Sequence, residues 1–161
     1  QVELARRKLD TGDYAGAARQ AERALKLDPT HEGARSVMDE ASVALGRVEA
    51  AATALRQAAA RGGEAGVGAA FELMKVDPSH PEAEKAAKAA GAGFRSRAEE
   101  ARRLATAART AADRAGGSRL PAFADGIALE KQGEQALQAG QYATAAQRFL
   151  EARIRFERAS R

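Results

Sequence analysis

Two histidines are the first residues to weigh as reactive groups, because an imidazole can bind a metal or move a proton near neutral pH. His31 and His80 each follow an Asp-Pro pair at the same distance. A repeated metal or acid–base site would use such a pair. Helix capping explains the pattern more simply, because each histidine begins an expected helix beside Thr30 or Ser79, which we predict as N-caps.

Neither the glycines nor the carboxylates form a recognisable active site. The glycine-rich stretch over residues 61–68 lacks the lysine, the Ser/Thr and the preceding strand that a phosphate loop needs, so we expect a turn there. Carboxylates such as Glu130 and Glu134 stand at helix-surface spacing among basic residues. With no cysteine, no Ser-His-Asp set and no clustered ligands, we expect no enzyme, no metal and no cofactor.

Arginines crowd one stretch of the chain and are candidates for an anion-binding surface. An acidic protein, an acidic lipid surface or a nucleic acid would all suit them. Nucleic acid is the weakest of these expectations, because no aromatic residues stand between the arginines to stack on bases and the formal net charge is only +4. The candidate basic patch consists of Arg95, Arg97, Arg102, Arg103 and Arg109.

The elements that must position these residues follow from the composition. Hydrophobic residues make up 45% of the 161 residues, but aromatic residues make up only 4% and most of the apolar residues are alanine. Alanine is the best helix former and buries little area. We therefore predict an all-α fold in which helices pack closely, with a thin core.

Two kinds of helix boundary each occur twice. Gly12 and Tyr14 recur as Gly140 and Tyr142, with alanines after each tyrosine. This pattern suits a tight turn between two helices, because glycine ends the first helix and the tyrosine packs over the turn. The Asp-Pro pairs at residues 28–29 and 77–78 suit helix ends, since the residue before proline is pushed out of the helical conformation.

Together these residues resemble the tetratricopeptide repeat. The resemblance implies a right-handed array of antiparallel helix hairpins that binds a partner protein through an extended surface. The first match comprises Ala5, Gly12, Tyr14, Ala17, Ala24, Leu25, Asp28 and Pro29. The second comprises Gly133, Gly140, Tyr142, Ala145, Phe149 and Ala152, and Asp77 with Pro78 matches a repeat ending in between.

Apolar spacing divides the chain into seven expected helices. Two of them are long and resemble coiled-coil helices, because the apolar phase continues through Gly46 in one and through Gly91 and Gly93 in the other. We predict one repeat domain over 1–161, with a hairpin at 1–29, a long-helix middle at 31–115 and a C-terminal hairpin at 119–160. The expected helices are 1–11, 14–27, 31–60, 64–76, 81–115, 120–139 and 141–160.

The predicted function is a non-catalytic scaffold that docks another protein or a peptide. Capture of a chaperone tail is not expected, because the chain has no asparagine. In style the sequence is similar to C-terminal helical-repeat regions of large bacterial multidomain proteins, including serine/threonine protein kinases, which implies recruitment or regulation of an attached domain. Alternatives are an anion-binding surface and a homo-oligomerisation device that uses Leu55 or Leu104.

The sequence gives less information on location. No apolar run approaches the ~20 residues that a membrane-spanning helix needs. The first four residues already fit the interior of a helix, so we expect a fragment whose natural start lies upstream. A cytoplasmic location is our expectation, and the lack of cysteine is compatible with it.

Overall fold

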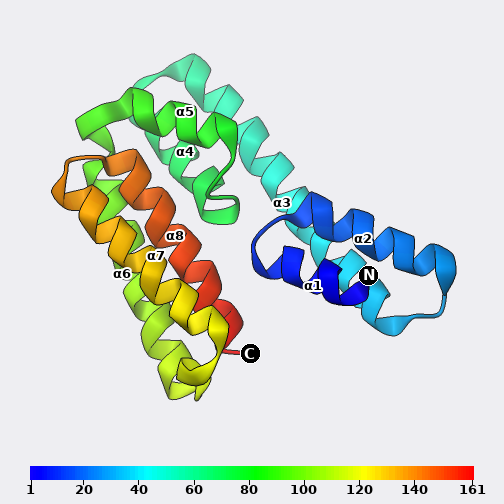
Figure 1. Ribbon diagram of the computed structural model, residues 1–161. Helices are drawn as coiled ribbons and strands as arrows, with labels where there is room; N and C mark the ends of the chain where they lie inside the picture. The colour runs from blue at the N-terminus through cyan, green and yellow to red at the C-terminus, as the bar shows by residue number, and fades with distance from the viewer. The chain divides into compact units, whose positions relative to one another are not determined.

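A computed structural model describes all residues from Gln1 to Arg161, and all of its regular elements are helical. The predicted all-α fold is confirmed. The eight α-helices, shown in Figure 1, are α1 (Val2–Asp10), α2 (Tyr14–Leu27), α3 (Glu32–Arg61), α4 (Gly63–Val76), α5 (Pro81–Ala90), α6 (Arg95–Arg114), α7 (Pro121–Gln138) and α8 (Tyr142–Ala159). Two short 3-10 helices, η1 (Gly91–Phe94) and η2 (Gly117–Arg119), flank α6.

The chain forms two compact units, Gln1–Ala50 and Ala51–Arg161. Helices α1 and α2 and the first part of α3 belong to the first unit. The rest of α3 and all later helices belong to the second. That these units form one repeat domain stays a prediction.

The first unit has a core of small side chains. Helix α1 packs against α2. Alanines dominate, so the helices can approach closely and little apolar area is buried per residue. Tyr14, Ala18 and Met38 pack against the cluster from its edge. The buried cluster is Ala5, Leu9, Ala17, Ala21, Val37 and Ala41.

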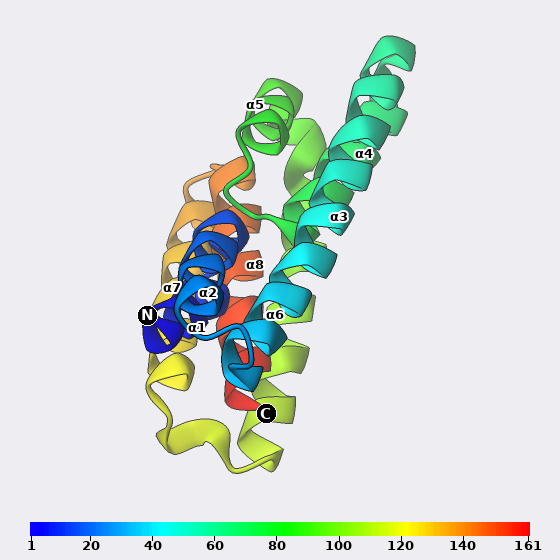
Figure 2. The ribbon, with the colours of Figure 1, turned by 90° about the vertical axis from the view of Figure 1, so that its right-hand side faces the viewer.

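The second unit is built around α8, which packs against both α6 and α7. The three helices run side by side in Figures 1 and 2. Helices α4 and α5 pack against each other and both contact α8. Large side chains fill this core, in contrast to the first unit. Those with almost no exposed surface are Phe71, Phe94, Phe149, Phe156, Leu73, Met74 and Leu150.

Glycines on α7 make room for two of these rings. A Cβ atom added at Gly133 would lie 2.8 Å from the ring of Phe149, and one added at Gly126 would lie 2.6 Å from the ring of Phe156. Real Cβ atoms do not approach this closely, so both positions require glycine as long as the rings stay in place. Helix α7 therefore lies closer to α8 than any larger side chain would permit.

The prediction of a long helix at 31–60 is confirmed, because α3 continues through Gly46 without a break. The prediction of a second long helix at 81–115 is wrong. Helix α5 ends where Gly91 adopts a φ of 55°, and the turn of η1 separates it from α6. Phe94 in this turn is buried, and its ring packs edge to face against the ring of Phe71, with 6.2 Å between the ring centroids. Continuous apolar phase therefore did not guarantee a continuous helix.

None of the helices is both long enough and apolar enough to span a membrane.

Candidate functional site

The two Gly-x-Tyr segments, at residues 12–14 and 140–142, share one backbone geometry, and we call them the first and second corner. Each glycine has a positive φ, 82° at Gly12 and 75° at Gly140. In both corners the N–H after the glycine donates to the carbonyl five residues earlier at 2.9 Å. The glycine N–H donates to the carbonyl three residues earlier at 3.1 Å. This is a Schellman motif, which closes α1 and α7 in the same way.

Other predicted signature residues lie where the corners need them. Tyr14 and Tyr142 begin α2 and α8 and are half-buried. Ala17 and Ala145, three residues further on, are fully buried.

The corners differ in how the next helix begins. In the first corner the carboxylate of Asp13 accepts a hydrogen bond from the N–H of Gly16 at 2.9 Å, which lowers the pKa of Asp13. A Cβ at Gly16 would lie 2.2 Å from that carboxylate, so this glycine makes room for the cap. Gln141 has the equivalent place in the second corner, and its side chain does not cap α8. The first turn of α8 therefore has no side-chain cap of the kind that Asp13 gives α2.

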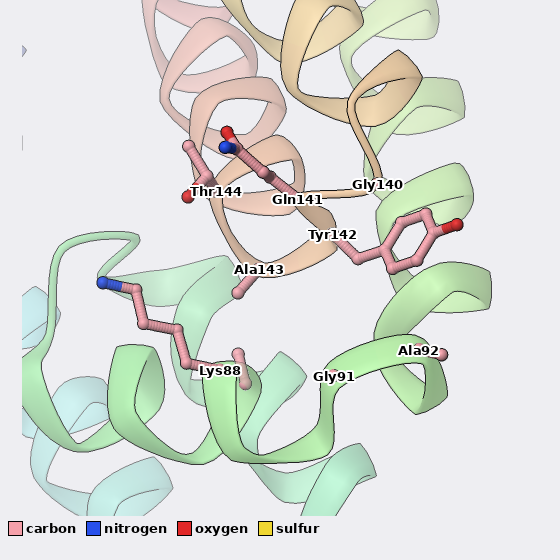
Figure 3. Close-up of a pocket in the computed structure, with 9 residues that line it drawn as sticks. Lys88, Gly91, Ala92, Gly140, Gln141, Tyr142, Ala143 and Thr144 are labelled. Atoms are coloured by element: carbon pink, nitrogen blue, oxygen red, sulfur yellow. The ribbon is translucent and has the colours of Figure 1, made fainter.

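A hollow of about 450 Å³ lies beside the second corner. Its walls come from two parts of the second unit that are far apart in sequence: the end of α5 with η1, and the second corner with the first turn of α8. Figure 3 shows Lys88 and Tyr142 on opposite sides of the hollow. The lining residues are Ala87, Lys88, Gly91, Ala92, Gly140, Gln141, Tyr142, Ala143 and Thr144.

The lining of the hollow suits hydrogen bonding rather than bond-making chemistry. Its polar lining residues are Gln141, Tyr142 and Thr144, and Lys88 contributes one ammonium group. That ammonium group, on Lys88, pairs with Glu84 at 2.7 Å. No carboxylate or imidazole lines the hollow.

The two Asp-Pro segments, at residues 28–31 and 77–80, also repeat one geometry, and we call them the first and second joint. In both, the N–H of the histidine donates to the aspartate carbonyl at 3.1 Å, which closes a tight turn. The hydroxyl of Thr30 donates to Oδ1 of Asp28 at 2.7 Å, and that of Ser79 donates to Oδ1 of Asp77 at 3.4 Å.

Burial sets the two aspartates apart. Hydrogen bonds from the side chain and the backbone of Thr30 lower the pKa of Asp28, which is exposed. Removal from water raises the pKa of Asp77, and the nearby His80 and Ser79 only partly offset this. The same residue in the same turn is thus stabilised as an anion in one unit and penalised in the other.

The predicted N-caps Thr30 and Ser79 are wrong, because their hydroxyls bind the aspartates. The histidines cap the helices instead. His31 Nδ1 accepts the N–H of Ala34 at 3.2 Å, at the start of α3. His80 Nδ1 accepts the N–H of Glu82 at 3.1 Å, at the start of α5. His31 thus binds the N–H three residues later, whereas His80 binds the N–H two residues later. Pro81, which follows His80, has no N–H to offer.

Four of the five arginines proposed as a basic patch are paired with glutamates. Arg95 pairs with Glu99 along α6 at 3.1 Å. The other three reach other helices: Arg97 to Glu64, Arg102 to Glu134 at 2.5 Å, and Arg109 to Glu130 at 2.5 Å. Arg103 is exposed and has no such partner. Most of the positive charge is therefore offset by nearby carboxylates.

Sequence reasoning missed Lys88, Thr144 and the glutamate partners. Lys88 lines the same hollow as the second corner although the two are far apart in sequence. Glu64 and Glu130 meet arginines that stand 33 and 21 residues away. No local pattern connects residues at such separations. The prediction of a turn over residues 61–68 holds only at its start, where α3 ends and Gly62 and Gly63 both have positive φ, because the rest of the stretch lies within α4.

No group of three or more histidine or acidic side chains is placed to hold a metal ion. No protein-family model matches the chain, and neither a curated protein nor a solved structure matches it significantly.

Proposed function

We propose that this chain is a non-catalytic helical-repeat module that docks a segment of another protein. The repetition of both boundary types carries the proposal. Each corner closes a helix with the same two hydrogen bonds, and each joint starts a helix with the same turn and with a cap from a histidine ring. Repeated boundaries of this kind are what a stacked array of helix hairpins would need, and such arrays bind partners through extended surfaces.

The hollow beside the second corner is the docking place that we propose. It has a volume within the range of ligand sites and offers polar groups from two separate segments. The partner segment would lie against the first turn of α8, near Ala143. An Arg introduced there would obstruct part of the hollow.

Affinity capture from a bacterial lysate with three versions of the chain tests this proposal. Ala143→Arg should lose proteins that the unmodified chain retains. Ala107→Arg is the matched control, because Ala107 is an exposed alanine on α6 outside the hollow. Equal retention by both variants, with unchanged helical circular dichroism, would refute the hollow as the docking place. Loss in both would indicate a non-specific charge effect and would also count against it.

The parent protein forms a further part of the proposal. We propose that the chain is a C-terminal docking or regulatory region of a larger cytoplasmic bacterial protein, such as a serine/threonine kinase. The support is the similarity of sequence style described above. Reading the complete coding sequence tests it, and a parent without a catalytic domain would refute it.

The two alternative functions are supported less well. Binding of nucleic acid or acidic lipid by the arginine patch would first have to break ion pairs at four of its five members. Self-association through Leu55 would need that side chain at the surface, whereas it is 4% exposed within the second unit. A polar residue at position 55 would therefore report on folding rather than on dimerisation.

A further inference from the structure

The first corner holds a carboxylate at the start of the helix that follows it. Asp13 accepts the N–H of Gly16, the third residue of α2, through Oδ1 at 2.9 Å. The ammonium group of Lys8 contacts Oδ2 of the same carboxylate at 3.1 Å. The hydrogen bond from Gly16 and, to a smaller extent, the contact with Lys8 lower the pKa of Asp13. A helix N–H and a lysine thus stabilise one aspartate anion between them.

The second corner has the corresponding donors but no carboxylate. Thr144 is the third residue of α8 and so corresponds to Gly16. Gln141 stands in the place of Asp13 and does not cap the helix, and the N–H of Thr144 donates to no other protein group. The ammonium group comes from Lys88 on α5, which lines the same hollow as Thr144. Both types of donor that hold Asp13 therefore recur around the hollow.

Lys88 is available to an incoming anion. Its ammonium group pairs with Glu84 along α5, but the two side chains are 60% and 38% exposed. Water weakens such exposed pairs, and an ammonium group has three hydrogens to donate. Lys88 also lies in the last turn of α5, where its charge offsets the negative end of the helix dipole. No other charged residue lines the hollow.

The N–H of Thr144 is reached from the side of the hollow. In the first corner a Cβ at Gly16 would lie 2.2 Å from the carboxylate of Asp13. Thr144 has a Cβ at the equivalent position, so the pose of Asp13 is closed to a side chain at position 141. Figure 3 shows Lys88 on α5 facing the first turn of α8, where Ala143 and Thr144 lie. A carboxylate that contacts this N–H therefore has to enter through the hollow.

We propose that the hollow binds an acidic side chain, aspartate or glutamate, of the docked segment. One carboxylate oxygen accepts the N–H of Thr144 and the other contacts the ammonium group of Lys88, as Asp13 does with its two donors. The small lining residues Ala87 and Gly91 leave room for the main chain of the segment. This assignment rests on the docking function proposed above and adds the chemistry of the ligand.

Nuclear magnetic resonance on the full chain tests the assignment with three acetylated tripeptides. The first is glycine-aspartate-glycine with an amidated C-terminus. The second has asparagine in place of the aspartate, and the third is triglycine with a free C-terminal carboxylate. The first should move the amide proton of Thr144 downfield in a saturable way, and the second should not. The amide proton of Gly16 should stay still with all three, because Asp13 already accepts it.

Lys88→Met removes the ammonium group and keeps the aliphatic stem. It should weaken binding of the aspartate tripeptide by about twofold to fivefold, which is the range of an exposed ion pair. Lys85→Met is the matched control and should leave the affinity unchanged, because Lys85 is an exposed lysine on the same helix outside the hollow. Both variants should keep the helical circular dichroism of the unmodified chain.

Any of four results would overturn the proposal. Equal shifts at Thr144 and Gly16 would indicate a general effect of anions. No saturable shift at Thr144 would show that the hollow takes no carboxylate. A response to triglycine alone would assign the hollow to the end of a chain rather than to an acidic side chain. Equal losses of affinity from Lys88→Met and Lys85→Met would show that Lys88 does not contact the ligand.

Failure of this assignment can be told apart from failure of the docking function. Loss of captured proteins with Ala143→Arg, but no response to the aspartate tripeptide, would leave docking in place and reject the acidic ligand. A response at Thr144 together with equal capture by Ala143→Arg and Ala107→Arg would reject the docking function and leave a carboxylate site.

Discussion

The first and second corners are built alike, but the helices that they join are held together by different side chains. Both corners close with a positive-φ glycine and the same two hydrogen bonds. Behind the first corner, the core is mostly alanine with one leucine and one valine. Behind the second, the fully buried rings of Phe149 and Phe156 press against Gly133 and Gly126.

The comparison separates two contributions that often coincide in helix pairs. The corner fixes where the chain turns, and it needs only residues that are neighbours in sequence. The burial behind the corner sets how strongly the helices are held, because apolar stabilisation scales with the area removed from water. Substitutions at the corners should therefore cost the two units similar amounts, and substitutions in the cores should not.

The largest effect should come from removing a ring from the second unit. Phe149→Ala deletes a fully buried ring and leaves a cavity that the glycine at position 133 cannot fill. We expect a loss of about 3–5 kcal/mol in the free energy of unfolding, measured by urea denaturation followed by circular dichroism. Val43→Ala is the control, because Val43 is 57% exposed in the first unit and should be nearly silent. A loss at Phe149 no larger than that of the control would contradict the tight packing of α7 on α8.

The next effect concerns the glycines themselves. Gly133→Ala would place a methyl group 2.8 Å from the ring of Phe149 and should destabilise the second unit by about 1–3 kcal/mol. Gly46→Ala is the matched substitution within a helix, because a Cβ there meets nothing within 4 Å. Gly46→Ala should raise the free energy of unfolding by up to about 1 kcal/mol, because alanine favours the helix more than glycine does. Thermal melting of both variants checks the pair, and effects of the same sign would contradict the contrast.

The features that could be predicted from the sequence are those encoded by neighbouring residues. Gly12 and Gly140 were predicted correctly at helix ends, because the glycine that ends one helix and the tyrosine that begins the next lie within three residues of each other. The proline joints were placed for the same reason. The continuity of α3 through Gly46 followed from unbroken apolar spacing together with an exposed, uncrowded glycine.

The features that could not be predicted depend on partners far away in the sequence. The turn at Gly91 is stabilised by the burial of Phe94 against Phe71, which the spacing of alanines around it does not reveal. Arg97 and Arg109 were assigned to an open basic patch, whereas Glu64 and Glu130 reach them from other helices. The hollow needs η1 next to the second corner, and that proximity is a property of the folded second unit.

A third prediction tests whether the corners are equivalent. Gly12→Ala and Gly140→Ala each force an L-residue into the left-handed region, and space is not limiting because a Cβ at either site meets nothing within 4 Å. We expect a cost of about 1 kcal/mol for each, measured as the shift of the unfolding free energy. A cost at one corner of more than twice that at the other would mean that the surrounding core, rather than the turn, sets the requirement for glycine.

The smallest effects are expected at the joints, where one carboxyl group has opposite pKa shifts in the two units. The folded state lowers the pKa of Asp28 below 3.8, so its anion stabilises the fold at neutral pH, and this contribution is lost only as the pH falls through the lowered value. The folded state raises the pKa of Asp77 above 3.8, so its anion carries a penalty at neutral pH that disappears as the pH falls through the raised value.

Neutral asparagine at each position makes these opposite shifts measurable. Asp28→Asn should lower the urea midpoint at about pH 7, because a charged acceptor for Thr30 is replaced by a weaker neutral one. Asp77→Asn should leave the free energy of unfolding unchanged or raise it by less than about 1 kcal/mol, since it removes a half-buried charge and keeps an oxygen for Ser79. Any gain from Asp77→Asn should shrink as the pH falls from neutral through the raised pKa of Asp77, because the natural carboxyl group is then neutral too. Equal losses from both variants at neutral pH would show that the two turns differ less in burial than the opposite shifts require.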